Sequence, residues 1–159
     1  PVLVLTGAGK VFSAGADLEA AKAGLAVSPV WEELSSALAA YPGLTIAELN
    51  GSVAGGAMGM VLACDLRVAA DHAAFFYPVM KLGFLPQPSD PKRMAALVGP
   101  SRAKRIFMAG EKISAETALS WGLVDEVANA KEIAAVTALW AEAPSAAKEG
   151  HPAAIKALF

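Results

Sequence analysis

Two short loops rich in Gly and Ala carry the residues whose types and spacing best suit chemistry. Their sequences are Phe12-Ser13-Ala14-Gly15-Ala16-Asp17 and Asn50-Gly51-Ser52-Val53-Ala54-Gly55-Gly56-Ala57. Each loop follows an apolar run and can lead into a helix, whose first backbone N–H groups have no partners within the helix. Small residues let a ligand approach the backbone closely, so two such N–H groups directed at one point would stabilise an oxyanion. The alternative, that Gly and Ala only permit tight packing of helix on sheet, stays open from spacing alone.

Other familiar motifs are incomplete. The turn at residues 7–10, Gly-Ala-Gly-Lys, precedes Val11, where a phosphate-binding P-loop needs Ser or Thr. Phe12 stands where the dinucleotide-binding fingerprint needs Gly or Ala. The two histidines, His72 and His151, lie in polar stretches, and their spacing supports no pairing with a Ser or Cys nucleophile.

The elements that must position the two loops alternate between strand and helix. Apolar, β-branched runs predict strands, and helical spacing together with N-cap residues and terminal glycines predicts helices. Strands are expected at 2–6, 44–49, 66–70, 74–77 and 123–127, and helices at 18–23, 29–41, 57–64, 90–98, 101–109, 115–121, 128–143 and 152–159. This alternation predicts an α/β fold with a parallel sheet.

Composition narrows the function classes. The 159 residues fit one domain, 55% of them are hydrophobic, and the formal net charge is −2. This balance excludes a disordered chain and argues against a nucleic-acid partner. The longest uncharged apolar run, 53–64, is shorter than the about 20 residues of a membrane-spanning helix, and no signal peptide is visible. We therefore expect a cytoplasmic protein whose apolar excess contacts a ligand or another subunit.

Both ends of the sequence predict further neighbours. Residues 2–6 are apolar on both faces, as in a strand from the middle of a sheet, and residues 152–159 begin a helix that has no C-cap. We expect residues 1–159 to be a single core domain from a longer chain.

A series of ordered motifs resembles the crotonase (enoyl-CoA hydratase/isomerase) superfamily. The motifs are Phe12–Leu18, Asn50–Gly56, Cys64–Ala69, Phe75–Pro86, Val98-Gly99, Gly110–Ile113 and Ala118–Asp125. The resemblance covers essentially the whole chain and implies a spiral of ββα units with parallel sheets, assembled as a homotrimer or a dimer of trimers. It also implies that an N-terminal strand-helix unit and C-terminal oligomerisation helices are missing from this sequence.

The resemblance further implies a function and its donors. The ligand would be an acyl-CoA thioester, handled by lyase or isomerase chemistry of fatty acid metabolism without a cofactor or metal. Carried over by position, the oxyanion-hole donors are the backbone N–H groups of Ala16 and Gly56. The CoA-binding residues would be Ala14, Gly15, Ala16, Asp17 and Leu18.

The acids and bases of the family are absent from their usual positions. Hydratases of this family use two glutamates, and here Gly59 and Val79 occupy those positions. Isomerases and dehalogenases place a carboxylate slightly later, at the position of Gln87. None of these three side chains can move a proton as a base, so hydratase activity is expected to be weak or absent.

Other polar residues are candidates for proton transfer. Tyr77 and Lys81 lie four residues apart in the third motif, and Lys81 is also read as a solvated surface residue. Asp90 is read chiefly as a helix cap before Pro91, and Asp65 as structural.

Asp17 is expected to support its own loop, whereas Trp31 and Phe76 are expected in the core or a pocket wall.

Two functional hypotheses remain. The first is an acyl-CoA enzyme whose chemistry relies on the oxyanion hole and on groups other than the family glutamates. The second is a non-catalytic acyl-CoA binder or scaffold subunit.

Overall fold

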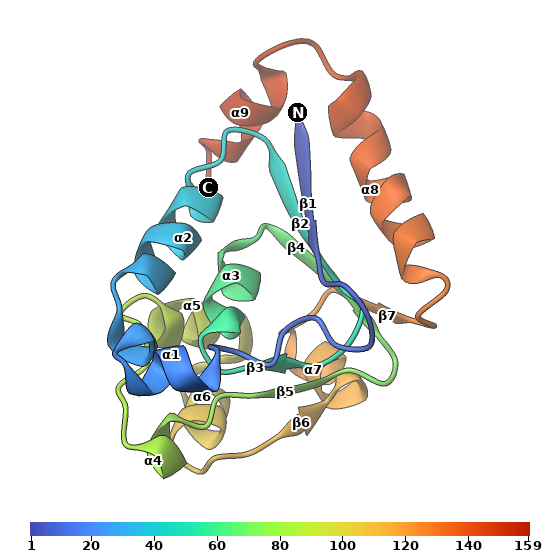
Figure 1. The fold of residues 1–159 in the computed structure, drawn as a ribbon. Coiled ribbons are helices and arrows are strands. Elements are labelled where there is room, and N and C mark those ends of the chain that lie inside the picture. Colours follow the sequence, from blue (N-terminus) through green and yellow to red (C-terminus); the bar gives the residue numbers. More distant parts are fainter.

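Two β-sheets form the framework of the protein in the computed structural model, which describes residues 1–159 (Figure 1). The larger sheet has the order β1-β2-β4-β7 and is parallel throughout. The smaller sheet has the order β3-β5-β6, with β3 parallel and β6 antiparallel to β5. The strands are β1 (Val2–Thr6), β2 (Leu44–Leu49), β3 (Val53–Ala54), β4 (Leu66–Ala70), β5 (Ala74–Phe76), β6 (Ile113–Ser114) and β7 (Glu126–Ala128).

Nine α-helices and one short 3₁₀ helix connect and cover these strands. They are α1 (Leu18–Lys22), η1 (Leu25–Val27), α2 (Val30–Ala39), α3 (Ala57–Ala63), α4 (Val79–Leu82), α5 (Asp90–Val98), α6 (Pro100–Phe107), α7 (Ala115–Trp121), α8 (Ile133–Ala146) and α9 (His151–Lys156). No helix has both the length and the hydropathy needed to cross a bilayer.

A strand-strand-helix order recurs along the chain. β2 of the larger sheet runs into β3 of the smaller sheet and then into α3, and β4 runs into β5 and then α4. The first unit follows the same course, because β1 is followed by Ser13, which forms a parallel bridge with Val53, and then by α1. Successive units therefore place their helix-entry loops side by side, which is the arrangement expected of a ββα spiral.

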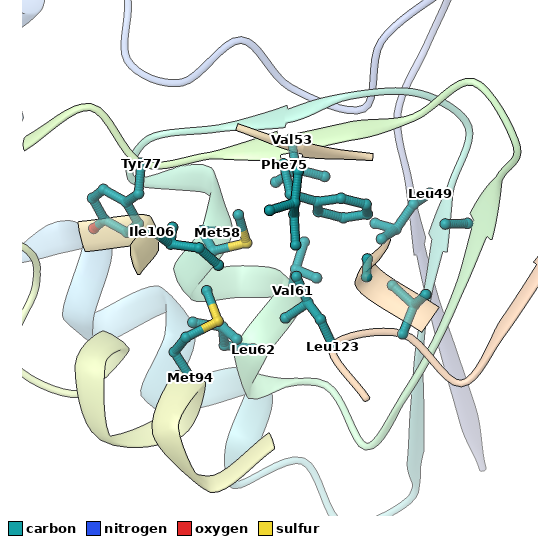
Figure 2. Close-up of a cluster of buried hydrophobic side chains, with 14 of the residues drawn as sticks. Leu49, Val53, Met58, Val61, Leu62, Phe75, Tyr77, Met94, Ile106 and Leu123 are labelled. Carbon is teal, nitrogen blue, oxygen red and sulfur yellow. The ribbon is translucent and has the colours of Figure 1, made fainter. Parts of the chain in front are cut away.

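The main hydrophobic core lies around α3, between the two sheets. Figure 2 shows Met58, Val61 and Leu62 of this helix gathered with Phe75 of β5 and Met94 of α5. Four of these five side chains have no solvent exposure, and the fifth, Leu62, is 5% exposed. A helix apolar on all sides must be covered on all sides, and α3 is covered by α2, α5 and the small sheet.

The side chains of β4 alternate between two apolar layers, one on each face of the large sheet. Ala69 belongs to the main core, whereas Val68 and Ala70 point to the opposite face and pack against Ile133 of α8. This is the two-residue period of a strand buried on both faces. The helix α8 therefore covers the face of the large sheet that lies away from α3 (Figure 1).

Buried Arg67 fastens the end of α3 to the large sheet. Its guanidinium donates hydrogen bonds to the carbonyl oxygens of Cys64 (2.6 Å), Leu123 (2.9 Å) and Val61 (3.3 Å), and it lies 3.8 Å from Asp125. Only 3% of Arg67 is exposed, and burial lowers its pKa below the ordinary value. The side chain therefore satisfies the carbonyl oxygens of Cys64, directly after α3, and of Leu123, and it adds a second bond to Val61, which also accepts from the N–H of Cys64.

Several elements differ from the sequence-based prediction. The strands β3 and β6 and the helix α4 were not predicted; each has four residues or fewer, which is too short to show a period. β7 and α8 begin three and five residues later than expected, since 123–125 form a turn and 128–132 complete a strand and a loop. The middle position predicted for β1 is not found within residues 1–159, where it is an edge strand and Val4 is 43% exposed.

Candidate functional site

The two Gly/Ala loops lie against each other at the carboxyl ends of β1 and β2. Backbone hydrogen bonds join them from both directions: Ser13 donates to Ser52 at 3.2 Å, and Ala54 donates to Ser13 at 3.0 Å. These bonds continue the small sheet by one bridge, between Ser13 and Val53. This pairing fixes the position of one loop relative to the other.

Asn50 and Gly15 explain why the loops can approach so closely. The side chain of Asn50 accepts from the N–H of Gly7 and donates to the carbonyl oxygens of Gly9 and Val11, which holds the turn before the first loop. Gly15 has a φ of +94°, and a Cβ at this position would lie 3.1 Å from the carbonyl oxygen of Ala54. Any side chain at Gly15 would therefore be strained and would push the loops apart.

The two backbone N–H groups expected to be oxyanion donors have no partner in the protein. Ala16 and Gly56 donate no hydrogen bond, although Gly15 donates to the Ser13 hydroxyl and Gly55 donates to the carbonyl oxygen of Phe76. Gly56 immediately precedes α3, where the free N–H groups of a helix start are found. Both groups are thus available to an external acceptor.

A cavity of about 230 Å³ lies between the two loops and the segment that follows β5. Its wall includes Ala14, Gly15, Ala16, Leu18, Ala54, Gly55, Gly56, Phe76, Tyr77, Val79 and Gln87. The ring of Trp31 also lines it, so close to Gly56 that a Cβ there would lie 3.3 Å from the ring. Trp31 and Phe76 are therefore wall residues, as predicted. Ligand pockets measure roughly 300–1,000 Å³, so this cavity suits a small part of a ligand.

Of the five predicted CoA-binding residues, four line this cavity. The exception is Asp17, whose Oδ1 accepts a hydrogen bond of 2.9 Å from the N–H of Ala20 at the start of α1. Asp17 supports its own loop, as the sequence analysis expected. A larger apolar hollow of about 620 Å³ shares Val79, Phe84 and Leu85 with the cavity, but neither donor loop reaches it.

The three positions where the family has carboxylates lie in or near the cavity. Val79 and Gln87 line the cavity, and Gln87 is 9% exposed. Gly59 is buried on α3, one helical turn after Gly56. A Cβ at Gly59 would lie only 2.8 Å from Oδ1 and 3.0 Å from Oδ2 of Asp90, so the carboxylate of Asp90 occupies the space beside this glycine.

The prediction that Asp90 caps a helix is wrong. Asp90 is the first residue of α5 and Ser89 precedes the helix, and the carboxylate turns inward to accept a 2.7 Å hydrogen bond from the hydroxyl of Tyr77. The side chain is fully buried, and its Oδ1 has no hydrogen-bond partner. Asp90 directly precedes Pro91 at a helix start, a pattern typical of a cap, and no local spacing indicates the inward direction.

The helix α2 holds the start of α5 in place. Glu32 accepts hydrogen bonds from the backbone N–H and the hydroxyl of Ser89, and the guanidinium of Arg93 donates a 2.9 Å bond to Ser35. The bond from the Ser89 hydroxyl is the main reason that the pKa of Glu32 lies below its ordinary value. Asp90 is thereby positioned from two helices, and burial raises its pKa to about 6.

The remaining candidates lie outside the cavity. Lys81 is exposed on α4 and lines no part of the cavity wall, so the structure gives it no neighbour for proton transfer there. Asp65 accepts hydrogen bonds from the N–H and hydroxyl of Thr45 and pairs with Lys156 at 2.8 Å, which agrees with a structural role.

The sequence comparisons agree on one family. The whole chain, residues 1–159, matches the family described as enoyl-CoA hydratase/isomerase. It is 36% identical over 142 residues to a carnitinyl-CoA dehydratase of Salmonella arizonae, covering 83% of this chain and 52% of that protein. It is also 36% identical over 126 residues to a probable enoyl-CoA hydratase of Mycobacterium leprae, covering 79% and 51% respectively. The chain thus spans about half the length of these curated relatives.

Solved structures show the same fold. Pseudomonas aeruginosa DspI superposes with a TM-score of 0.87 at 35% identity, over 99% of this chain and 61% of that one. An enoyl-CoA hydratase from Bacillus anthracis superposes with a TM-score of 0.80 at 32% identity, over 91% of this chain and 58% of that one. The ordered motifs, the paired loops and these matches lead to one conclusion: the chain belongs to the enoyl-CoA hydratase/isomerase family, the crotonase superfamily.

Proposed function

We propose that this chain binds an acyl-CoA thioester between the two loops and stabilises negative charge on the thioester oxygen. The observation that carries the proposal is the pair of unpartnered N–H groups at Ala16 and Gly56, on two loops that hydrogen bonds fix side by side. The carnitinyl-CoA dehydratase and enoyl-CoA hydratases among its relatives are named for CoA thioesters, which supports the same ligand class.

The two N–H donors would stabilise an enolate or another oxyanion most strongly. When a proton or carboxyl group leaves the α-carbon of a thioester, charge develops on the carbonyl oxygen. Two donors held in place by the fold stabilise that charge without reorganising, and removal of one such donor typically lowers kcat by about 10²–10³-fold. The apolar walls of the cavity strengthen these bonds by excluding water. A homotrimer or a dimer of trimers, in the cytoplasm, is the assembly and location that we propose with this function.

A non-catalytic acyl-CoA binder is the second candidate. It is favoured by Gly59 and Val79, which leave the cavity without the two glutamates of a hydratase. Both candidates require binding, but only the first requires chemistry at the thioester.

Binding is tested by replacing Gly15 with Ala. The change adds a Cβ at a φ of +94° and 3.1 Å from the Ala54 carbonyl oxygen, so we expect the loops to separate. A left-handed conformation costs a residue with a Cβ about 1–2 kcal/mol, and the contact adds to this cost. Calorimetry with butyryl-CoA should show affinity in the wild type of the full-length protein and at least tenfold weaker binding in Gly15→Ala.

The matched control is Gly110→Ala. Gly110 also has a positive φ, of +67°, but a Cβ there would meet nothing within 4 Å, and the residue lies outside the cavity. It should lose some stability and keep its affinity for butyryl-CoA. Absence of binding by the wild type would contradict the proposed function.

A further inference from the structure

Two polar residues lie at the cavity wall, where the usual glutamates are missing. Tyr77 and Gln87 both line the cavity. The hydroxyl of Tyr77 accepts a 3.5 Å hydrogen bond from the N–H of Gln87 and donates the 2.7 Å bond to Oδ2 of Asp90. Tyr77 is 4% exposed and stands at one end of the core cluster in Figure 2, with Phe107 packed against its ring at 4.9 Å. Tyr77 therefore connects the cavity wall to the buried carboxylate of Asp90.

Burying the Asp90 carboxylate without a cationic partner costs stability, which is unexpected for a purely structural residue. It is fully buried, it forms no salt bridge with any Lys or Arg, and its Oδ1 has no hydrogen-bond partner. An unpaired buried polar atom is rare in proteins and reduces stability. A neutral Asn could accept the same bond from Tyr77 without burying a charge. A buried acid that has no cationic partner and lies one hydrogen bond from a cavity-wall residue is a candidate functional residue.

Asp90 lies beside the position on α3 where this chain has Gly59 in place of a family glutamate. Its two carboxylate oxygens would lie 2.8 and 3.0 Å from a Cβ at Gly59, the position of one missing glutamate. A carboxylate is thus present beside this position, but it is supplied by α5 instead of α3.

Resting on the function proposed above, we propose that Tyr77 and Asp90 transfer the α-proton of the bound acyl-CoA thioester. The C–H bond breaks as the Tyr77 oxygen takes the proton, and the former hydroxyl hydrogen of Tyr77 moves to Oδ2 of Asp90. The electron pair of the C–H bond passes into the enolate, whose oxygen accepts hydrogen bonds from Ala16 and Gly56. The reverse step returns the proton to carbon, so no other reactant is consumed. Tyr77 is the catalytic residue, and Asp90 acts through it.

The burial of Asp90 and the charges around it set the pH at which this transfer operates. Burial is the largest influence and raises the pKa of Asp90 to about 6. The hydrogen bond from Tyr77 and the charge of Arg93 on α5 oppose this rise, whereas the charge of Glu32 on α2 adds to it. Asp90 must be ionised to accept the proton. The transfer rate should therefore rise with pH, with a midpoint near 6, and fall in acid.

Exchange of the α-hydrogens of butyryl-CoA with D₂O tests the pair directly. Proton NMR should show exchange catalysed by the full-length wild type. Asp90→Asn and Tyr77→Phe should each lower the exchange rate at least 100-fold while binding butyryl-CoA within about threefold of the wild type. The control Asp71→Asn makes the same chemical change at an exposed carboxylate and should exchange like the wild type. Near-UV circular dichroism checks that each variant is folded.

The outcomes separate this inference from the proposed function. Binding of butyryl-CoA without exchange by the wild type would overturn the proton-transfer pair alone, and so would full exchange in Asp90→Asn or Tyr77→Phe. If neither binding nor exchange occurs, the proposed function fails together with the pair. Should the variants not fold, the wild type decides, because a rate independent of pH between 5 and 7 would also overturn the role of Asp90.

Discussion

Replacement of Arg67 by Met in the full-length protein is expected to lower the free energy of unfolding by about 3–5 kcal/mol. Methionine retains much of the apolar stem but removes every donor of the guanidinium. The carbonyl oxygens of Cys64 and Leu123 would lose these bonds and remain buried, and each unpaired group costs roughly 1–3 kcal/mol. The carbonyl oxygen of Val61 would lose one bond but keep the one from the N–H of Cys64. Urea denaturation measures the change.

Arg105→Met is the matched control for this prediction. Arg105 also makes two good hydrogen bonds, at 2.7 and 2.8 Å to Glu111, but on the surface, where water replaces them. Its loss of stability should be much smaller than that of Arg67→Met. Equal stability of the two variants would show that the buried carbonyl groups at the end of α3 find other partners.

Hydration of crotonyl-CoA by the wild type is expected to stay near the uncatalysed rate. Hydration needs one group to direct water and another to handle the α-proton. Neither Gly59 nor Val79 has a titratable side chain, and the proposed transfer by Tyr77 and Asp90 would supply only the second group. Efficient hydration would show that other residues replace both glutamates.

Restoring hydration requires the removal of Asp90 as well as two new glutamates. A side chain at Gly59 would meet the Asp90 carboxylate at 2.8 Å, and two acids in one buried space would repel each other. We therefore expect the double change Gly59→Glu/Val79→Glu to gain little. Addition of Asp90→Gly should raise crotonyl-CoA hydration at least 100-fold above the double variant, measured by loss of enoyl absorbance. Equal rates would contradict the proposed competition for space.

Long apolar elements were predictable because their signals are local. β2 and α3 follow the sequence-based bounds closely, since an apolar strand and an apolar helix between Gly-rich turns each repeat over at least one full period. The two Gly/Ala loops were also visible in the sequence from their small residues. The CoA-binding residues expected there came from the family resemblance, and four of the five line one cavity.

The proton-transfer pair could not be found in this way. The contact of Tyr77 with Asp90 depends on how α5 packs against α2 and α3, and on the absence of a side chain at Gly59, which leaves room for the Asp90 carboxylate. A helix start such as Ser89-Asp90-Pro91 favours capping on local grounds. In the folded chain, however, the bonds of Ser89 to Glu32 and of Arg93 to Ser35 fix α5 against α2, and the carboxylate bonds inward to Tyr77. Long-range packing of this kind leaves no mark in the spacing of residues.

The most direct test of the central claim is a crystal structure of the full-length protein with a bound acyl-CoA thioester. We expect the thioester oxygen to lie within about 3.2 Å of both backbone nitrogens, those of Ala16 and Gly56. The α-carbon should then face Tyr77. A thioester oxygen that contacts neither nitrogen, or an acyl group bound outside the cavity between the loops, would contradict the account.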